Sequence, residues 1–260
     1  MNKFAIIGGT GVYSPELFTE SSKISVETPY GSASMLKANY KEKEIYFLER
    51  HGEGHTTPPH QVNYRANIWA LKKLSIDRVI ATAAVGSMNL DMPPGSFIIL
   101  SDFLDFTKSR PNTFFENDKG VVHIDMTEPY CPEVREALIA SCKKLKLPFS
   151  EHGVYACFEG PRFETRSEIK MFQTLGADVV GMTNVPEVTL AKEANLCYGT
   201  VAMITNFCTG ISKSPLSHEE VVNKMQSMSD NIRSLILLAI DEMKPDKGCR
   251  CGSSVKEKII

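Results

Sequence analysis

Short apolar and β-branched runs alternate along the chain with longer stretches whose apolar residues recur at helical spacing. Glycine and polar residues bound the short runs, as is usual where a strand gives way to a loop. These runs predict strands at residues 3–9, 43–52, 77–87, 95–103, 152–161, 177–183 and 198–206. Strands that alternate with helices indicate an α/β fold with a largely parallel sheet covered on both faces.

The helical stretches have a clear apolar face or clear end signals. Residues 63–74 place Trp69, Ala70 and Leu74 on one face, and residues 131–145 and 164–176 are also predicted helices. Ser217 and Glu220 have the spacing of a capping box, and we expect a long amphipathic helix to follow it through residues 232–243. Without internal repeats or linkers, the pattern predicts one domain over residues 1–243. A polar tail over residues 244–260 is expected to be loose.

Composition and charge narrow the class of protein. The 260 residues carry a formal net charge of −2, so no basic excess favours nucleic acid as a partner. No apolar run approaches the roughly 20 residues that span a bilayer, and residues 1–11 lack the features of a signal peptide. We therefore expect a cytoplasmic protein. Its seven cysteines are scattered, apart from Cys249 and Cys251, and do not predict a disulfide framework.

The first predicted strand runs into a glycine-rich turn. Gly8, Gly9 and Gly11 would let backbone N–H groups approach an anion, and Thr10 adds a hydroxyl donor. The turn is not a P-loop, and Ser14 stands where a dinucleotide-binding motif has its third glycine. An anion site and a tight structural turn both fit this pattern.

A second anion site is predicted where residues 43–52 end. Arg50 could fork onto a phosphate, with His51 as a further donor. His51 and His55 have the spacing of a zinc-binding pair on a helix, but Gly52 and Gly54 oppose a helix there. We expect no metal at this place, and a solvated loop is the alternative to the anion site.

Two further stretches have the character of a heterocycle site. Phe163 beside Glu164 offers an aromatic face with a neighbouring hydrogen-bond acceptor. The apolar run at residues 198–204 ends on Asn206, followed by Cys208. A carboxamide at a strand end is typical of a ligand site in an open α/β sheet, although a plain turn also explains it.

Five blocks of the sequence closely resemble the methylthioadenosine phosphorylase branch of the purine nucleoside phosphorylases, from about residue 4 to beyond residue 225. The blocks are GGTG (8–11), RHG to IWALK (50–72), HIDMTEPYCPEVRE (123–136), EGPRFETRSE (159–168) and GADVVGMTNVPEVTLAKEANLCY (176–198). The resemblance implies one α/β domain with a mixed central sheet flanked by helices. It also implies a homotrimer, or a homohexamer built as a dimer of trimers.

The resemblance implies an enzyme that cleaves the N-glycosidic bond of a purine nucleoside. Inorganic phosphate is the co-substrate, and neither a metal nor an organic cofactor takes part. Phosphate attacks C1′ while the sugar becomes cation-like and the purine leaves with the bonding electrons. Such an enzyme must hold the phosphate dianion and stabilise the leaving base, and it needs no protein nucleophile.

Several positions match the family's site residues. The implied phosphate ligands are Thr10, Arg50, His51, the Ala84 backbone and Thr183. The family usually has threonine where this chain has Ala83, so one hydroxyl donor is missing. Phe163 matches the residue that packs on the base, and Met182 matches the one against the ribose. His123 matches a histidine that crosses the subunit interface to the neighbour's 5′ pocket.

The residues expected to recognise the base and the 5′ group differ from those of the methylthioadenosine branch. That branch has aspartates at the positions of Asn206 and Cys208, where they bind adenine. The family members that cleave inosine and guanosine have asparagine at position 206. They also have a glutamate matching Glu164, which accepts from purine N1–H, and a histidine matching His218, which bonds the 5′-hydroxyl. We therefore assign Phe163, Glu164, Asn206 and Cys208 to the base site.

These residues predict a 6-oxopurine nucleoside phosphorylase of purine salvage, with Asn206 and His51 in catalytic roles. It would release hypoxanthine or guanine and ribose 1-phosphate from inosine or guanosine. Methylthioinosine phosphorylase and methylthioadenosine phosphorylase are the alternatives within the family. A dinucleotide-binding oxidoreductase and a non-enzymatic binding module are the alternatives from other classes. Some relatives from hot environments carry a disulfide at the Cys249–Cys251 position, and an inert reduced pair fits this chain equally.

Overall fold

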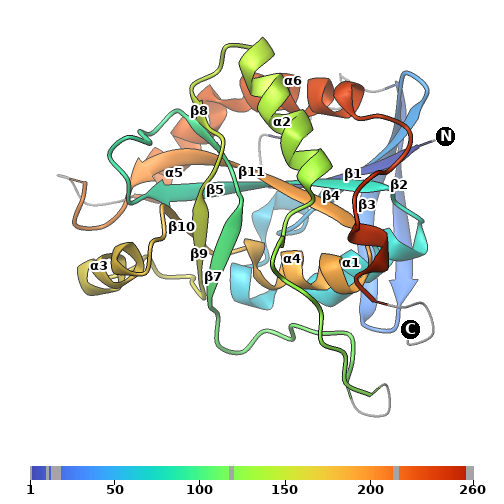
Figure 1. Cartoon of the computed structure of the whole chain (residues 1–260), viewed down its shortest axis with the longest axis horizontal. Helices are drawn as coiled ribbons and strands as arrows, with labels where there is room; N and C mark the ends of the chain where they lie inside the picture. The colour runs from blue at the N-terminus through green and yellow to red at the C-terminus, as the bar shows by residue number, and fades with distance from the viewer. Residues whose placement is uncertain (1, 10–11, 13–18, 117–119, 213–216, 256–260) are drawn as a thin grey trace.

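The computed structural model describes residues 2–9, 12, 19–116, 120–212 and 217–255, and a mixed β-sheet runs through them (Figure 1). Its strands are β1 (Lys3–Gly8), β2 (Thr19–Thr28), β3 (Gly31–Tyr40), β4 (Lys43–Glu49), β5 (Arg78–Ser87), β6 (Phe97–Ile99), β7 (Asp102–Phe106), β8 (Phe149–Ser150), β9 (Val154–Phe158), β10 (Val179–Gly181) and β11 (Cys197–Phe207). The predicted mixed sheet is confirmed.

Strand β5 is the centre of the sheet. It pairs in parallel with β1 on one side and with β11 on the other, while its last residues pair antiparallel with β10. Strand β4 pairs in parallel with β1. The carboxyl ends of β4, β1, β5 and β11 therefore meet at one edge of the sheet, where open α/β folds bind small molecules.

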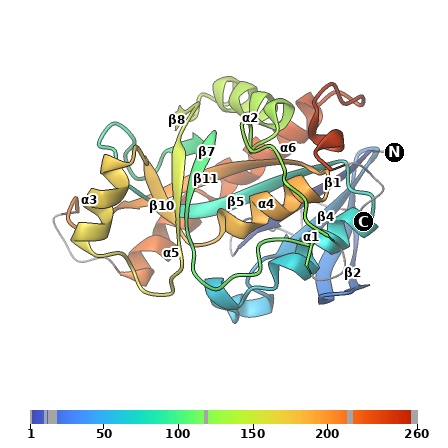
Figure 2. The same ribbon diagram turned by 60° about the horizontal axis from the view of Figure 1, so that its bottom comes forward.

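Helices cover both faces of the sheet (Figures 1 and 2). They are α1 (Tyr64–Lys73), α2 (Pro132–Lys144), α3 (Arg166–Thr174), α4 (Asn184–Glu193), α5 (His218–Ser227) and α6 (Ser229–Glu242), with short 3-10 helices at Glu53–His55, Pro59–Gln61 and Cys251–Ser253. Helices α2 and α6 pack together over one face, and α1 and α4 pack together over the other. Among the described residues, none of these helices combines the length and the apolar character needed to cross a bilayer.

Four elements differ from the sequence-based expectation. Strands β2 and β3, which form an antiparallel ribbon at the sheet edge, and helix α4 were not predicted. The expected long terminal helix is divided at Met228 into α5 and α6. Each of the helices α1, α3 and α5 begins at a side-chain cap, from Asn63, Thr165 and Ser217 respectively.

The tail is packed where the sequence predicted a loose segment. Cys251 and Val255 are 5% and 3% exposed, which places both in the interior. Asn195 fixes this end of the chain, because its side chain donates to Val255 O and accepts from Val255 N, both at 2.9 Å. Cys251 and Val255 therefore anchor this part of the tail in the folded core, while Arg250, Gly252 and Ser253 stay exposed.

Candidate functional site

A cavity of about 490 Å³ lies at the edge where the parallel strands end. Strand ends, the loops that follow them and one face of α5 form its wall. The lining residues are Gly9, Arg50, His51, Thr56, Thr57, Pro58, Pro59, Thr82, Ala83, Ala84, Val85, Gly86, Pro161, Phe163, Glu164, Val180, Gly181, Met182, Thr183, Met203, Thr205, Asn206, His218, Val221 and Met225. The cavity therefore brings together most of the side chains that the sequence placed in the site.

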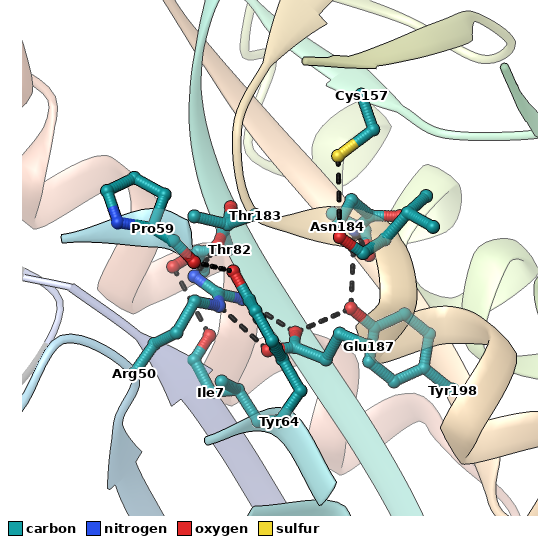
Figure 3. Close-up of polar contacts among 12 residues, drawn as sticks. Ile7, Arg50, Pro59, Tyr64, Thr82, Cys157, Thr183, Asn184, Glu187 and Tyr198 are labelled. Carbon is teal, nitrogen blue, oxygen red and sulfur yellow. Dashed lines mark hydrogen bonds and ion pairs between the residues drawn. The ribbon is translucent and has the colours of Figure 1, made fainter. Parts of the chain in front are cut away.

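A buried ion pair between Arg50 and Glu187 fixes the Arg50 guanidinium at the cavity (Figure 3). Arg50 follows β4, and its Nε and Nη2 donate to the two carboxylate oxygens of Glu187 at 2.8 and 2.7 Å. Its Nη1 donates to Thr82 O at 2.9 Å. These contacts use three of the five N–H groups of a guanidinium. Within the described contacts, the other two are available to a ligand in the cavity.

His51 and Thr183 lie near this cation on the cavity wall. The Nδ1 atom of His51 is 2.8 Å from Thr57 O, and because a carbonyl only accepts, Nδ1 carries the proton. This bond fixes the plane of the ring. Thr183 precedes α4, and its backbone N–H donates to Tyr155 Oη at 3.1 Å. Thr10, the remaining predicted side-chain donor, lies outside the described residues.

The carboxyl half of β5 supplies backbone to the cavity. Ala83 and Ala84 both line it, and Ala84 is the residue whose backbone the resemblance assigns to phosphate. Thr82, one residue earlier, also lines the cavity, but its hydroxyl is 3.4 Å from Ile7 O and is directed to that carbonyl. It does not replace the hydroxyl that Ala83 lacks.

A β-bulge in β11 delivers Asn206 to the cavity. The pairing with β5 shifts between Ile204 and Asn206, so Thr205 is the extra residue. Consecutive residues of a regular strand point to opposite faces, yet Thr205 and Asn206 both line the cavity. Thr205 Oγ1 is 2.8 Å from Asn206 Oδ1, and Asn206 Nδ2 donates to Phe207 O at 3.0 Å. The amide has a second N–H, which is the donor that a ligand can use.

The loop after β9 places an aromatic ring and an acid side by side. Phe163 is 39% exposed, whereas Glu164 is 6% exposed, and both line the cavity. Burial raises the pKa of the Glu164 carboxyl, with a smaller rise from the charge of Glu168. Gly160 has a φ of +68°, and a Cβ there would lie 2.5 Å from Met182 Sδ. The loop can therefore approach the cavity residue Met182 only with glycine at this position.

Helix α5 closes the cavity with one polar and two apolar side chains. His218, Val221 and Met225 line the cavity from successive turns of this helix. The spacing of three and four residues puts all three on one helical face. His218 is the first residue of α5 and is exposed, as the predicted position on the capped helix requires.

Two predicted site residues lie outside this wall. Cys208 is fully buried and is packed behind Gly86, whose added Cβ would lie 2.9 Å from Cys208 Sγ. Burial raises the pKa of this thiol, and Glu164 adds to the rise. His123 is exposed in the segment between β7 and α2 and does not line the cavity of its own chain. His51 and His55 do not lie on an α-helix, because Gly52 and Gly54 have φ values of 71° and 73°.

Sequence reasoning missed Glu187 and the bulge at Thr205. Glu187 is 0% exposed in a helix whose other side chains are mostly buried and apolar. An acid within such a run is a signal for a buried partner, since unpaired charges are costly inside a protein. The bulge has no comparable signal, because it follows from the register between β11 and β5.

The sequence and the fold of this chain are similar to those of known enzymes. A family described as "Phosphorylase superfamily" matches residues 3–241. A Moorella thermoacetica protein named "Probable 6-oxopurine nucleoside phosphorylase" is 55% identical over 96% of this chain and 96% of its own. The 6-oxopurine nucleoside phosphorylase of Pyrococcus furiosus is 48% identical over 98% of each chain. The solved structure of methylthioadenosine phosphorylase from Schistosoma mansoni with adenine has a TM-score of 0.90 and 34% identity, over 95% of this chain and 93% of that one.

Proposed function

The chain belongs to the phosphorylase superfamily, and from this membership we propose that it is a 6-oxopurine nucleoside phosphorylase of purine salvage. Nucleoside phosphorylases are pentosyltransferases, and the proposed reaction moves ribose from the base to phosphate. Inosine or guanosine gives hypoxanthine or guanine and ribose 1-phosphate. The reaction uses inorganic phosphate as co-substrate and needs neither a metal nor an organic cofactor.

The observation that carries the choice of base is the joint presence of Asn206 and Glu164 in one cavity. A 6-oxopurine presents an N1–H donor and an O6 acceptor, whereas adenine has an acceptor at N1 and a donor at position 6. The Glu164 carboxylate accepts from N1–H, and the Asn206 amide donates to O6 or N7. Phe163 offers its ring to the face of the base.

A second group of residues on the cavity wall suits phosphate. Arg50 and Thr183 provide donors, His51 can donate from Nε2 when both of its ring nitrogens are protonated, and the glycine-rich turn after β1 adds the backbone of Gly9. We assign phosphate to this group, with Met182 between it and the base as the ribose contact. Phosphate held here would attack C1′ while Asn206 stabilises the negative charge that develops on the leaving purine.

A phosphorolysis panel tests this assignment. The substrates are inosine, guanosine, adenosine, methylthioinosine and methylthioadenosine, each measured with and without phosphate. We expect phosphate-dependent release of hypoxanthine and guanine and little release of adenine. Preference for 6-aminopurines in the wild-type protein would refute the proposal, as would base release without phosphate.

The variant Asn206→Asp tests the residue that makes the choice. A carboxylate cannot donate to O6, so the ratio of inosine to adenosine turnover should fall by about 100-fold or more. Asn223→Asp is the matched control, because Asn223 is exposed on α5 outside the cavity. An unchanged ratio in Asn206→Asp would contradict the assignment of Asn206.

One observation favours methylthioinosine as a second candidate substrate. Val221 and Met225 line the cavity beside His218, so the α5 wall is apolar as well as polar. An apolar wall suits a methylthio group at C5′, and the same Asn206 and Glu164 would read its base. The panel separates the two, since a 5′-hydroxyl enzyme turns over inosine faster than methylthioinosine.

We further propose a homotrimer or homohexamer in which His123 reaches the 5′ pocket of a neighbouring subunit. His123 is exposed, and Val121 beside it is an apolar side chain with 81% exposure. Native mass measurement tests the assembly. The variant His123→Ala should weaken nucleoside binding without dissociating the oligomer.

A reducing cytoplasm is the proposed location, because all seven cysteines are free.

A further inference from the structure

Four cysteines from three distant parts of the sequence meet away from the cavity. The Sγ atoms of Cys131, Cys197, Cys249 and Cys251 all lie within 4.8 Å of one another. The Cys197 and Cys249 sulfurs are 3.3 Å apart, and all four cysteines are free thiols. Three of them are buried and Cys249 is partly exposed. None of the four lines the cavity.

The protein scaffold holds each side of this cluster firmly. Cys131 is the residue before α2, and its backbone N–H donates to Tyr198 O at 2.7 Å, beside Cys197 at the start of β11. The tail that carries the other two cysteines passes the start of β11 in Figure 1. Gly248 donates its backbone N–H to the Glu133 carboxylate in the first turn of α2. The sulfurs are thus brought together by backbone contacts that do not depend on a bond between them.

The surroundings of Cys131 favour negative charge. Cys131 lies at the N-terminus of α2, a 13-residue helix whose dipole stabilises negative charge at that end. Arg78 is the β5 partner of Cys197 in the sheet, so both side chains project from the same face. Arg78 is 1% exposed, and its Nη2 donates to Glu133 at 3.3 Å and to Asp246 O at 3.2 Å.

Arg78 has more donors than its described partners use. Its Nε and Nη1 atoms are buried without a hydrogen-bond partner among the described residues. A buried guanidinium with two unpaired donor nitrogens fits beside an anionic group that accepts from it. A metal held by four thiolates is such a group, because its net charge is −2 and its sulfurs accept N–H donors from the outer shell.

We propose that Cys131, Cys197, Cys249 and Cys251 form a structural zinc site. A tetrahedral zinc ion with Zn–S bonds of about 2.3 Å separates its sulfurs by about 3.8 Å. This separation is compatible with the four Sγ atoms, which all lie within 4.8 Å of one another. Four protein ligands close the site, so the ion has no open position for catalysis. It would tie the tail to α2 and β11 and stabilise the folded state, because the unfolded chain has no such site.

Metal content of the full-length protein tests the proposal. The protein is reduced with a phosphine, incubated with Zn²⁺, freed of unbound metal on a desalting column and analysed by mass spectrometry for zinc. We expect about one zinc per chain, as a four-thiolate site requires. In the double variant Cys249→Ser/Cys251→Ser this zinc should be lost. Cys142→Ala, which removes another buried cysteine from α2, should retain it.

A second measurement does not depend on variants. Co²⁺ loaded in place of zinc should give the intense visible bands of tetrahedral cobalt and the sulfur-to-cobalt charge-transfer band of thiolate ligation. Bound zinc should also raise the Tm of the wild-type protein above that of the double variant. Phosphorolysis at moderate temperature should be equal in both, which separates this proposal from the proposed function.

Three results would overturn the proposal. The first is a reduced wild-type protein that retains no zinc after desalting. The second is equal zinc retention by the wild type and the double variant. The third is a cobalt spectrum without thiolate charge transfer. A protein isolated with two disulfides that takes up no zinc after reduction belongs to the first case, and would show that the four sulfurs pair covalently instead.

Discussion

Arg50 and Glu187 form a two-point ion pair in the interior, with Nε–Oε2 and Nη2–Oε1 distances of 2.8 and 2.7 Å. Their side chains are 2% and 0% exposed, and Tyr198 Oη donates to the same carboxylate at 2.7 Å. Burial alone would lower the pKa of Arg50, but the charge and hydrogen bonds of Glu187 outweigh it and raise that pKa. The guanidinium is therefore a permanent cation whose charge is already balanced before phosphate binds.

The variant Glu187→Gln should make the protein depend on phosphate for stability. It leaves the Arg50 charge buried without a counter-ion, and breaking a buried pair in this way costs about 3 kcal/mol or more. A bound phosphate dianion would supply the missing negative charge. We therefore expect a lower Tm without phosphate, and a larger rise of Tm on adding phosphate than in the wild type. Thermal unfolding over a series of phosphate concentrations measures both.

Glu193→Gln is the matched control for this prediction. Glu193 is also buried on α4, but it accepts from the Thr113 hydroxyl and the Phe114 backbone rather than from a cation. Its variant should respond to phosphate as the wild type does. Equal phosphate responses in all three proteins would show that Arg50 does not meet phosphate.

Thr205→Val should lower turnover through the orientation of Asn206. The Thr205 hydroxyl is 2.8 Å from Asn206 Oδ1, and valine keeps the shape of the side chain without this contact. One lost hydrogen bond of about 1 kcal/mol corresponds to a fall in kcat on inosine of five- to tenfold. The KM for phosphate should not change. Thr205→Ser should restore kcat, and a serine variant as slow as the valine variant would show that the methyl group matters instead.

The sequence predicted the centre of the fold better than its edges. Strands β1, β5 and β11 are buried on both faces and appear in the sequence as nearly continuous apolar runs. Strand β3 alternates buried and exposed residues in a ribbon rich in serine and lysine, so its apolar signal is weak. Helix α4 is buried on most sides and therefore lacks the apolar stripe by which a surface helix is found.

The candidate site was predictable where it follows strand ends. Arg50, Thr183 and Asn206 all lie at or just beyond a strand, and topology brings such positions to one edge. Contacts that depend on register or on distant segments were not predictable. The Arg50–Glu187 pair joins residues 137 positions apart, and the cysteine cluster joins three separate elements. Sequence spacing carries no information at such separations.

Glu164 should set the acid limb of the pH profile with 6-oxopurine substrates. Burial raises its pKa above the ordinary value for a glutamate, and the ionised carboxylate is a much stronger acceptor for purine N1–H than the protonated acid. As the pH falls through this raised pKa, kcat/KM for inosine should therefore fall, at a higher pH than an exposed glutamate would cause. Glu164→Gln should be slower and should lack this limb. Glu219→Gln, on the exposed side of α5, should keep it, and an unchanged limb in Glu164→Gln would assign it elsewhere.

His218→Val should shift the preference of the enzyme at the 5′ position. His218 shares the α5 wall of the cavity with Val221 and Met225, so valine makes that wall wholly apolar. Inosine would lose the partner of its 5′-hydroxyl, while methylthioinosine would gain apolar contact. We expect the ratio of kcat/KM for inosine to that for methylthioinosine to fall by about tenfold or more, because inosine loses one hydrogen bond while methylthioinosine gains apolar contact. His60→Val, an exposed histidine outside the cavity wall, is the control. A ratio equal to that of the control would mean that the 5′ group is recognised by other residues, and the apolar side chains of α5 would then favour methylthioinosine as the substrate.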